Sequence, residues 1–219
     1  MKYHIEGTLY PILIIDLDED EQVITQTHAL LSMTGDVEMK TRMYGGITKG
    51  ARRMAGGETV FLTTFTAKSD GQQVSLSDNV CGTILPLQID INHAYLCDRA
   101  AYLCSETAVD LDVAFMKKIR MGLFGGESFV MERISGNGMV FLHGWGELQK
   151  KTLWAEEKLE VATGCIMAVS TSATLDVKFI RSVSNILFSG QGLFMTKVTG
   201  PGDVYIQSMV GYRETGNPK

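Results

Sequence analysis

The sequence has few prolines, no excess of positive charge and no long apolar run, and each shortage excludes something. Four prolines stand against 23 glycines, a ratio that suits many turns between short strands better than long helices. Twenty basic residues face 25 acidic ones, for a net charge of −5, so no overall cationic field attracts a nucleic acid. The longest early apolar stretch, residues 9–15, contains Pro11 and is far shorter than the roughly 20 residues of a membrane helix. Nucleic acid is therefore disfavoured as a general partner, and a transmembrane segment is excluded.

Cysteines are also few, and their spacing gives no sign of a redox or metal motif. The four are Cys81, Cys97, Cys104 and Cys165, and no two of them form a Cys-x-x-Cys pair. The first residues, Met-Lys-Tyr-His-Ile-Glu-Gly, lack the apolar centre of a signal peptide. We expect reduced thiols and a cytoplasmic location.

The composition that remains is that of an ordinary globular protein. Hydrophobic residues make up 45% of the 219 residues and charged residues 21%, which argues against disorder. Single β domains often reach about 200 to 250 residues. The chain is thus long enough for one large β domain.

An internal repeat dominates the sequence and predicts the fold. Residues 124–143 align without a gap with residues 188–207, apolar on apolar and glycine on glycine, at a distance of 64 positions. A third copy begins at Gly57 with a longer turn. Upstream of each copy, residues 37–40, 109–112 and 175–178 alternate apolar with charged side chains, the pattern of strands with one buried face.

Each copy also carries a turn signal between two apolar runs. Asn137-Gly138 and Pro201-Gly202 are dipeptides that reverse the chain, so we expect one β-hairpin per repeat. Consecutive apolar residues before the first turn favour strands covered on both faces, as in a sandwich. A 3.6-residue apolar stripe is visible at most over residues 114–121, so we expect little helix.

The sequence therefore predicts a single all-β domain, residues 1–219, made of three β repeats. The units span approximately residues 1–84, 85–147 and 148–212, pack around a pseudo-threefold axis and share a core. Residues 213–219 are polar, contain Gly216 and Pro218 and are expected to form a flexible tail.

Several short motifs carry a resemblance to a known family over nearly the whole chain. They are Ala51-Arg52-Arg53, Gly57-Glu58, Gly126-Glu127 and Gly200-Pro201-Gly202. Together they resemble the altered-inheritance-of-mitochondria biogenesis protein family, which includes bacterial members of unknown function. One departure is Gln191, where the family more usually has glutamate.

The resemblance implies a fold, an assembly and no reaction. The fold is similar to the subunit of the tryptophan RNA-binding attenuation protein, a β-sandwich or double-stranded β-helix-like unit. The assembly is a homo-oligomer, with a trimer as the suggested size. Fold similarity to an RNA-binding ring is analogy, because function lies in sites and not in folds.

The most unusual segment, residues 42–57, combines cations with glycines on an expected loop. Its cations are Arg42, Lys49, Arg52 and Arg53. Backbone N–H groups beside arginines can bind a phosphate or carboxylate, so anion binding is one hypothesis. The alternative is a flexible connection whose arginines pair with acidic residues.

Glu58 and Glu127 recur at the same repeat position. A carboxylate pair can perform acid–base chemistry only if both reach one cleft, and a structural role as paired carboxylates is favoured. The four histidines are scattered, without the spacing of a metal site. No metal, no cofactor and no catalytic residue is predicted.

The leading hypothesis is a non-enzymatic binding or scaffold protein that self-associates through its β repeats, with an unidentified protein partner. One alternative is an RNA-binding regulator similar to the attenuation protein. Another is a small-molecule binder or cupin-like enzyme.

Overall fold

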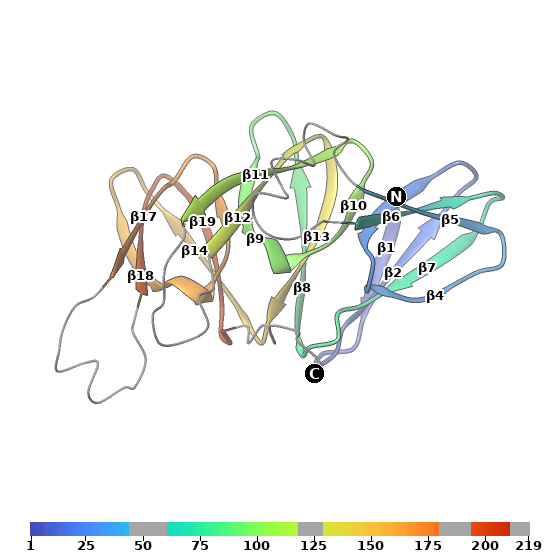
Figure 1. Cartoon of the computed structure of the whole chain (residues 1–219), viewed down its shortest axis with the longest axis horizontal. Coiled ribbons are helices and arrows are strands. Elements are labelled where there is room, and N and C mark those ends of the chain that lie inside the picture. Colours follow the sequence, from blue (N-terminus) through green and yellow to red (C-terminus); the bar gives the residue numbers. More distant parts are fainter. Residues whose placement is uncertain (44–60, 118–128, 180–193, 211–219) are drawn as a thin grey trace.

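The chain forms antiparallel sheets almost throughout, as the computed structural model shows for residues 1–43, 61–117, 129–179 and 194–210 (Figure 1). The helices in these ranges are two single-turn 3-10 segments, η1 (Arg99–Ala101) and η2 (Thr163–Cys165). Neither is long or apolar enough to cross a bilayer, and the described ranges contain no other helix. The all-β prediction is confirmed.

The strands of the described residues form four sheets, which we number 1 to 4. Sheet 1 has the order β1 (Lys2–Glu6), β2 (Ile12–Leu17), β7 (Gln72–Leu76), β4 (Leu30–Met33). Sheet 2 has the order β5 (Val37–Met43), β6 (Phe61–Ala67), β3 (Gln22–Gln26), β10 (Tyr102–Glu106), β13 (Gly138–Trp145), β8 (Gly82–Ile89). Sheet 3 has the order β11 (Val109–Lys117), β12 (Phe129–Gly136), β9 (Tyr95–Asp98), β16 (Ile166–Ser170), β19 (Gly202–Gln207), β14 (Leu148–Leu153). Sheet 4 has the order β15 (Lys158–Ala162), β18 (Phe194–Thr199), β17 (Thr174–Phe179).

Apolar side chains fill the spaces between successive sheets in three clusters. Phe65 of sheet 2 and Ile15 of sheet 1 belong to the cluster between those sheets. Leu142 and Ile134 belong to the cluster between sheets 2 and 3, and Val198 to the cluster between sheets 3 and 4. The sheets consequently stack in a row, from the blue end to the orange end in Figure 1. The two central sheets are covered on both faces, which explains why their strands read as continuous apolar runs.

The alternating segments found in the sequence are strands, as predicted. Residues 37–40, 109–112 and 175–178 lie in β5, β11 and β17. The apolar stripe at residues 114–121 suggested a helix, and this interpretation is wrong for residues 114–117, which continue β11. Pairing along β12 extends that strand, and sheet pairing outweighs a short helical pattern.

The predicted hairpins are wrong, although the predicted turns exist. The strands on either side of Asn137 belong to different sheets, since β12 pairs with β11 and β9, whereas β13 pairs with β10 and β8. The same holds around Pro201, where β18 lies in sheet 4 and β19 in sheet 3. The turn residues thus move the chain from one layer to the next.

Glycine is required at this crossing for a steric reason. Gly136 has a φ of +105° and Gly138 a φ of +144°, values that side chains disfavour. A Cβ on Gly136 would also collide with the carbonyl oxygen of Ala108. The sequence signal for a sharp turn was therefore sound, and only the destination of the chain was not readable from it.

Strand pairings recur along the chain in one scheme. The strands after β1 form three sets of six, β2 to β7, β8 to β13 and β14 to β19. In each set the first strand pairs with the sixth: β2 with β7, β8 with β13, and β14 with β19. The third strand also pairs with the sixth: β4 with β7, β10 with β13, and β16 with β19. The second and the fourth strands both pair with the fifth in each set. By this scheme the boundary predicted after Ile84 falls inside β8, whereas the boundary before Leu148 coincides with the start of β14.

Candidate functional site

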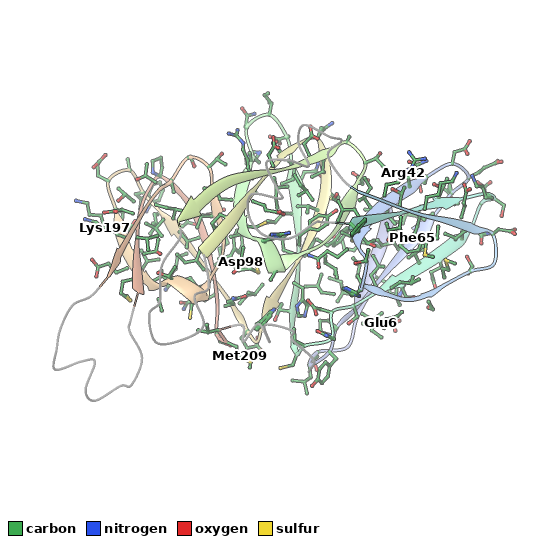
Figure 2. The ribbon with its side chains drawn as sticks, viewed as in Figure 1. Glu6, Arg42, Phe65, Asp98, Lys197 and Met209 are labelled. Carbon is green, nitrogen blue, oxygen red and sulfur yellow. The ribbon has the colours of Figure 1, made fainter. Side chains whose placement is uncertain are left out.

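Of the predicted anion-binding cations, Arg42 is the one that lies within the described residues. It stands on β5 opposite Leu62 of β6, with its side chain exposed. Figure 2 labels Arg42 on the outside of the ribbon, whereas Phe65 points between the sheets. Lys49, Arg52 and Arg53 lie outside the described residues, as do the carboxylates Glu58 and Glu127. The anion-binding hypothesis and the carboxylate roles remain predictions.

The described charges next to Arg42 are already paired. The carboxylate of Glu38 accepts a hydrogen bond from Lys40 Nζ at 2.7 Å and another from Lys68 Nζ at 2.8 Å. These two hydrogen bonds lower the pKa of Glu38 to about 2. Lys40 and Lys68 are exposed and Glu38 is partly exposed, so the cluster fixes local charge more than it stabilises the fold.

The histidines are spread over different parts of the structure. His4 contacts Glu6 at 3.4 Å, and His93 contacts Asp90 at 2.8 Å. Over residues 1–43, 61–117, 129–179 and 194–210, no group of three or more histidine, cysteine or acidic side chains is arranged to hold a metal ion.

His143 is a buried titratable group on β13, next to the crossing between the first and second strand sets. Neither ring nitrogen has a hydrogen-bond partner within the described chain, and the nearest charge is Asp78 Oδ2, 3.5 Å from Nδ1. Gly82 packs against the ring so closely that a Cβ there would lie 2.6 Å from Cε1. Burial lowers the pKa of His143, while Asp78 opposes that shift.

Lowering the pH from about 7 to 5 is expected to destabilise the protein partly through His143. Because its folded pKa lies below the usual 6.5, the unfolded chain takes up the proton first. The stability that neutral His143 contributes is present above about pH 6.5 and is lost as the pH falls toward the folded pKa. Urea unfolding at both pH values should show a smaller loss for His143→Leu than for the unsubstituted protein.

The matched control for this measurement is His28→Leu, because His28 is exposed. It should retain the pH dependence of the unsubstituted protein. Equal pH dependence in all three proteins would contradict the assignment to His143.

The four cysteines are free thiols, as predicted. Burial raises the pKa of Cys97 and Cys104 well above the usual value, and it also raises the pKa of Cys165. These three thiols are therefore protonated near neutral pH and are not activated nucleophiles.

An open hollow of about 530 Å³ lies beside the Gly136 turn, bordered by Asp90, Arg133 and Asn137. Hydrogen bonds from His93 hold the pKa of Asp90 below its usual value. The hollow is shallow and its rim includes the exposed Ile91. Its geometry suits surface contact better than the enclosure of a small ligand.

Two sheet edges stand out from the recurring pairing scheme. Among the described strands, β4 pairs with β7 alone and β15 with β18 alone. Their counterparts are paired on both sides, because β10 also joins β3 and β16 also joins β9. Other edge strands, such as β5, β11 and β17, have one partner in every set. We call the residues Leu30–Met33 the β4 edge and the residues Lys158–Ala162 the β15 edge.

Sequence reasoning missed these edges, although a signal was present. Leu31 and Met33 lie in an apolar segment that reads as a buried strand, yet both are exposed. Apolar residues on an exposed sheet edge invite pairing with another strand.

Together the stacked sheets and the free edges define a class: an all-β protein of layered antiparallel sheets. The chain belongs to the mitochondrial biogenesis AIM24 family, whose profile matches residues 3–209. This confirms the family resemblance seen in the sequence. No curated protein matches the chain.

A solved structure supports the fold over nearly the whole chain. The crystal structure of protein SPYM3_0169 from Streptococcus pyogenes superimposes with a TM-score of 0.75 and covers 95% of this chain and 94% of its own. The two sequences are 23% identical, so the similarity establishes the fold alone.

Proposed function

We propose that this chain is a non-enzymatic scaffold protein of the cytoplasm that associates with copies of itself through its sheet edges. The observation that carries the proposal is that the row of sheets ends in two incomplete ones. Sheets 1 and 4 each hold three strands of the recurring scheme, with β1 added to sheet 1, whereas sheets 2 and 3 each hold six. An incomplete sheet with an unpaired edge is a ready template for association.

The recurring pairings support three equivalent units in the chain. The first unit runs from β2 to β7, the second from β8 to β13 and the third from β14 to β19. Each unit would contribute three strands to one sheet and three to the next. The pseudo-threefold axis, the similarity to the attenuation protein subunit and the single-domain organisation remain predictions. In the row of Figure 1 the first and third units lie at opposite ends.

Exposed apolar side chains on the N-terminal sheets add to this proposal. Tyr3 and Ile5 of β1 and Leu31 and Met33 of β4 are all more than one-third exposed. A concentration of apolar groups on one end of a protein is typical of an interaction surface.

Size-exclusion chromatography with light scattering at micromolar concentration tests the proposal. We expect a finite assembly with a mass that is a multiple of the 24.1 kDa chain, and the family resemblance suggests a multiple of three. A mass equal to one chain across the concentration range would overturn the self-association.

A further inference from the structure

The two free edges are the two halves of a junction that the chain already makes twice. In sheet 2, β10 of the second unit pairs with β3 of the first, and in sheet 3, β16 of the third unit pairs with β9 of the second. Each complete sheet is thus three strands of one unit joined to three strands of the next. The half-sheet β17-β18-β15 and the half-sheet β4-β7-β2 are the same two halves, unjoined.

The β4 edge has the shape of the strands that make the internal junctions. The strands β4, β10 and β16 each shift register by one residue at the same point. The bulged residues are Leu31 in β4, Leu103 in β10 and Met167 in β16. A bulge changes the twist and direction of an edge in a defined way. At the internal junctions the bulged side chain is 3% exposed (Leu103) or 0% exposed (Met167), whereas Leu31 is 56% exposed.

A second position on the β4 edge shows the same contrast. Met33 is equivalent to Ser105 of β10 and Val169 of β16, because each lies opposite the same position of the neighbouring strand. Ser105 and Val169 are buried, but Met33 is 41% exposed. The free edge therefore carries apolar side chains at positions that the internal junctions bury.

Among the described residues, the apolar cluster at the other end of the row has no side chain from a following unit. Leu103 contributes to the cluster between sheets 1 and 2, and Met167 to the cluster between sheets 2 and 3, so each cluster receives a side chain from the following unit. In the third cluster the described residues come from the second and third units. Leu31 of another copy would take the corresponding place there.

We infer that β15 of one copy pairs antiparallel with β4 of a second copy, joining sheet 4 of one copy to sheet 1 of the other in a seven-stranded sheet of order β17-β18-β15-β4-β7-β2-β1. The inference rests on the proposed self-association and specifies its geometry. Transferring the internal register places Met33 opposite the partner's Glu160 and Ser32 opposite the partner's Val161, as Val169 lies opposite Leu96 and Ala168 opposite Cys97.

This contact joins two different surfaces of the chain, so it is head-to-tail. Repetition of such a contact produces a ring where the rotation closes and a filament where it does not. A closed ring leaves no β4 or β15 edge exposed, and a finite mass in light scattering distinguishes it from a filament.

Disulfide trapping between two singly substituted proteins tests the geometry. Met33→Cys and Glu160→Cys change exposed residues and are co-expressed with different tags, then treated with a mild oxidant. Residues directly opposite in an antiparallel pair have Cα atoms about 4.5 to 5.5 Å apart, within the range of a disulfide. We expect a disulfide-linked dimer containing both tags, absent from either variant alone and from the unsubstituted protein with its native thiols.

The off-register control is Met33→Cys with Lys158→Cys, an exposed position two residues along the same strand. Trapping of Met33→Cys with itself would indicate a twofold contact and overturn the head-to-tail arrangement. The arrangement would also be overturned if light scattering showed an oligomer but Met33→Cys with Glu160→Cys gave no more disulfide-linked dimer than Met33→Cys with Lys158→Cys. A single-chain mass would remove the proposed function together with this inference.

Discussion

Replacing Leu31 and Met33 by aspartate is expected to break the assembly into single chains at micromolar concentration. Both side chains are exposed in the isolated chain, so the substitutions should leave its fold intact. In the assembly, the aspartate at position 31 would be buried in an apolar cluster, and the aspartate at position 33 would lie opposite the carboxylate of the partner's Glu160, and both placements are costly. Loss of a central apolar anchor weakens association by about 2 kcal/mol or more, or roughly 30-fold in dissociation constant.

The control for the double variant is Met39→Asp, which places one aspartate at an exposed methionine of β5. The counterparts of β5 are edge strands in every unit, so this variant should keep the mass of the unsubstituted assembly. Light scattering gives the mass of each variant, and thermal unfolding shows whether the variant has kept its fold. Dissociation by Met39→Asp, or an unchanged mass for Leu31→Asp with Met33→Asp, would show that the β4 edge is not the contact.

Much of the strand pattern could be predicted from local sequence. The alternation in residues 37–40, 109–112 and 175–178 corresponds to β5, β11 and β17 because a strand with one buried face has a period of two. Gly136, Gly138 and Gly202 mark real turns and have positive φ. The alternation and the turn glycines depend only on residues that are neighbours in the chain, so they can be recognised in a single sequence.

The sheet membership of each strand could not be predicted in the same way. A turn at Gly136 to Gly138 is compatible with a hairpin and with a step between layers, and the choice depends on partners far along the chain. β13 pairs with β8 and β10 instead of β12, since buried apolar residues on both of its faces require sheets on both sides. Long-range pairing of this kind leaves no local signature.

The candidate site was the least predictable part. The cations around Arg52 attract notice by composition, but composition does not reveal what a loop contacts. Leu31 and Met33 were unremarkable as apolar residues of a strand. They became informative only when the structure showed that Leu103, Met167 and their neighbours bury the same positions elsewhere in the chain.

Phe141→Ala is expected to lower the free energy of unfolding by about 3 to 5 kcal/mol, the usual cost of removing a buried phenylalanine ring. Phe141 is fully buried and lies edge-on to Tyr3, with ring centroids 4.7 Å apart. It belongs to β13 of the second unit but packs in the cluster between sheets 1 and 2 with residues of the first unit. Its removal therefore weakens two units at once, and calorimetry should show one transition at a lower temperature.

The control is Phe61→Ala, since Phe61 is exposed at the start of β6 and surface truncations usually change stability by less than about 0.5 kcal/mol. A similar loss in both variants would contradict the burial argument. A separate early transition in Phe141→Ala would mean that the first unit unfolds on its own. Because sheet 2 is built from both units and its two faces line two clusters, opening one cluster exposes part of the next, and a single transition is the expected result.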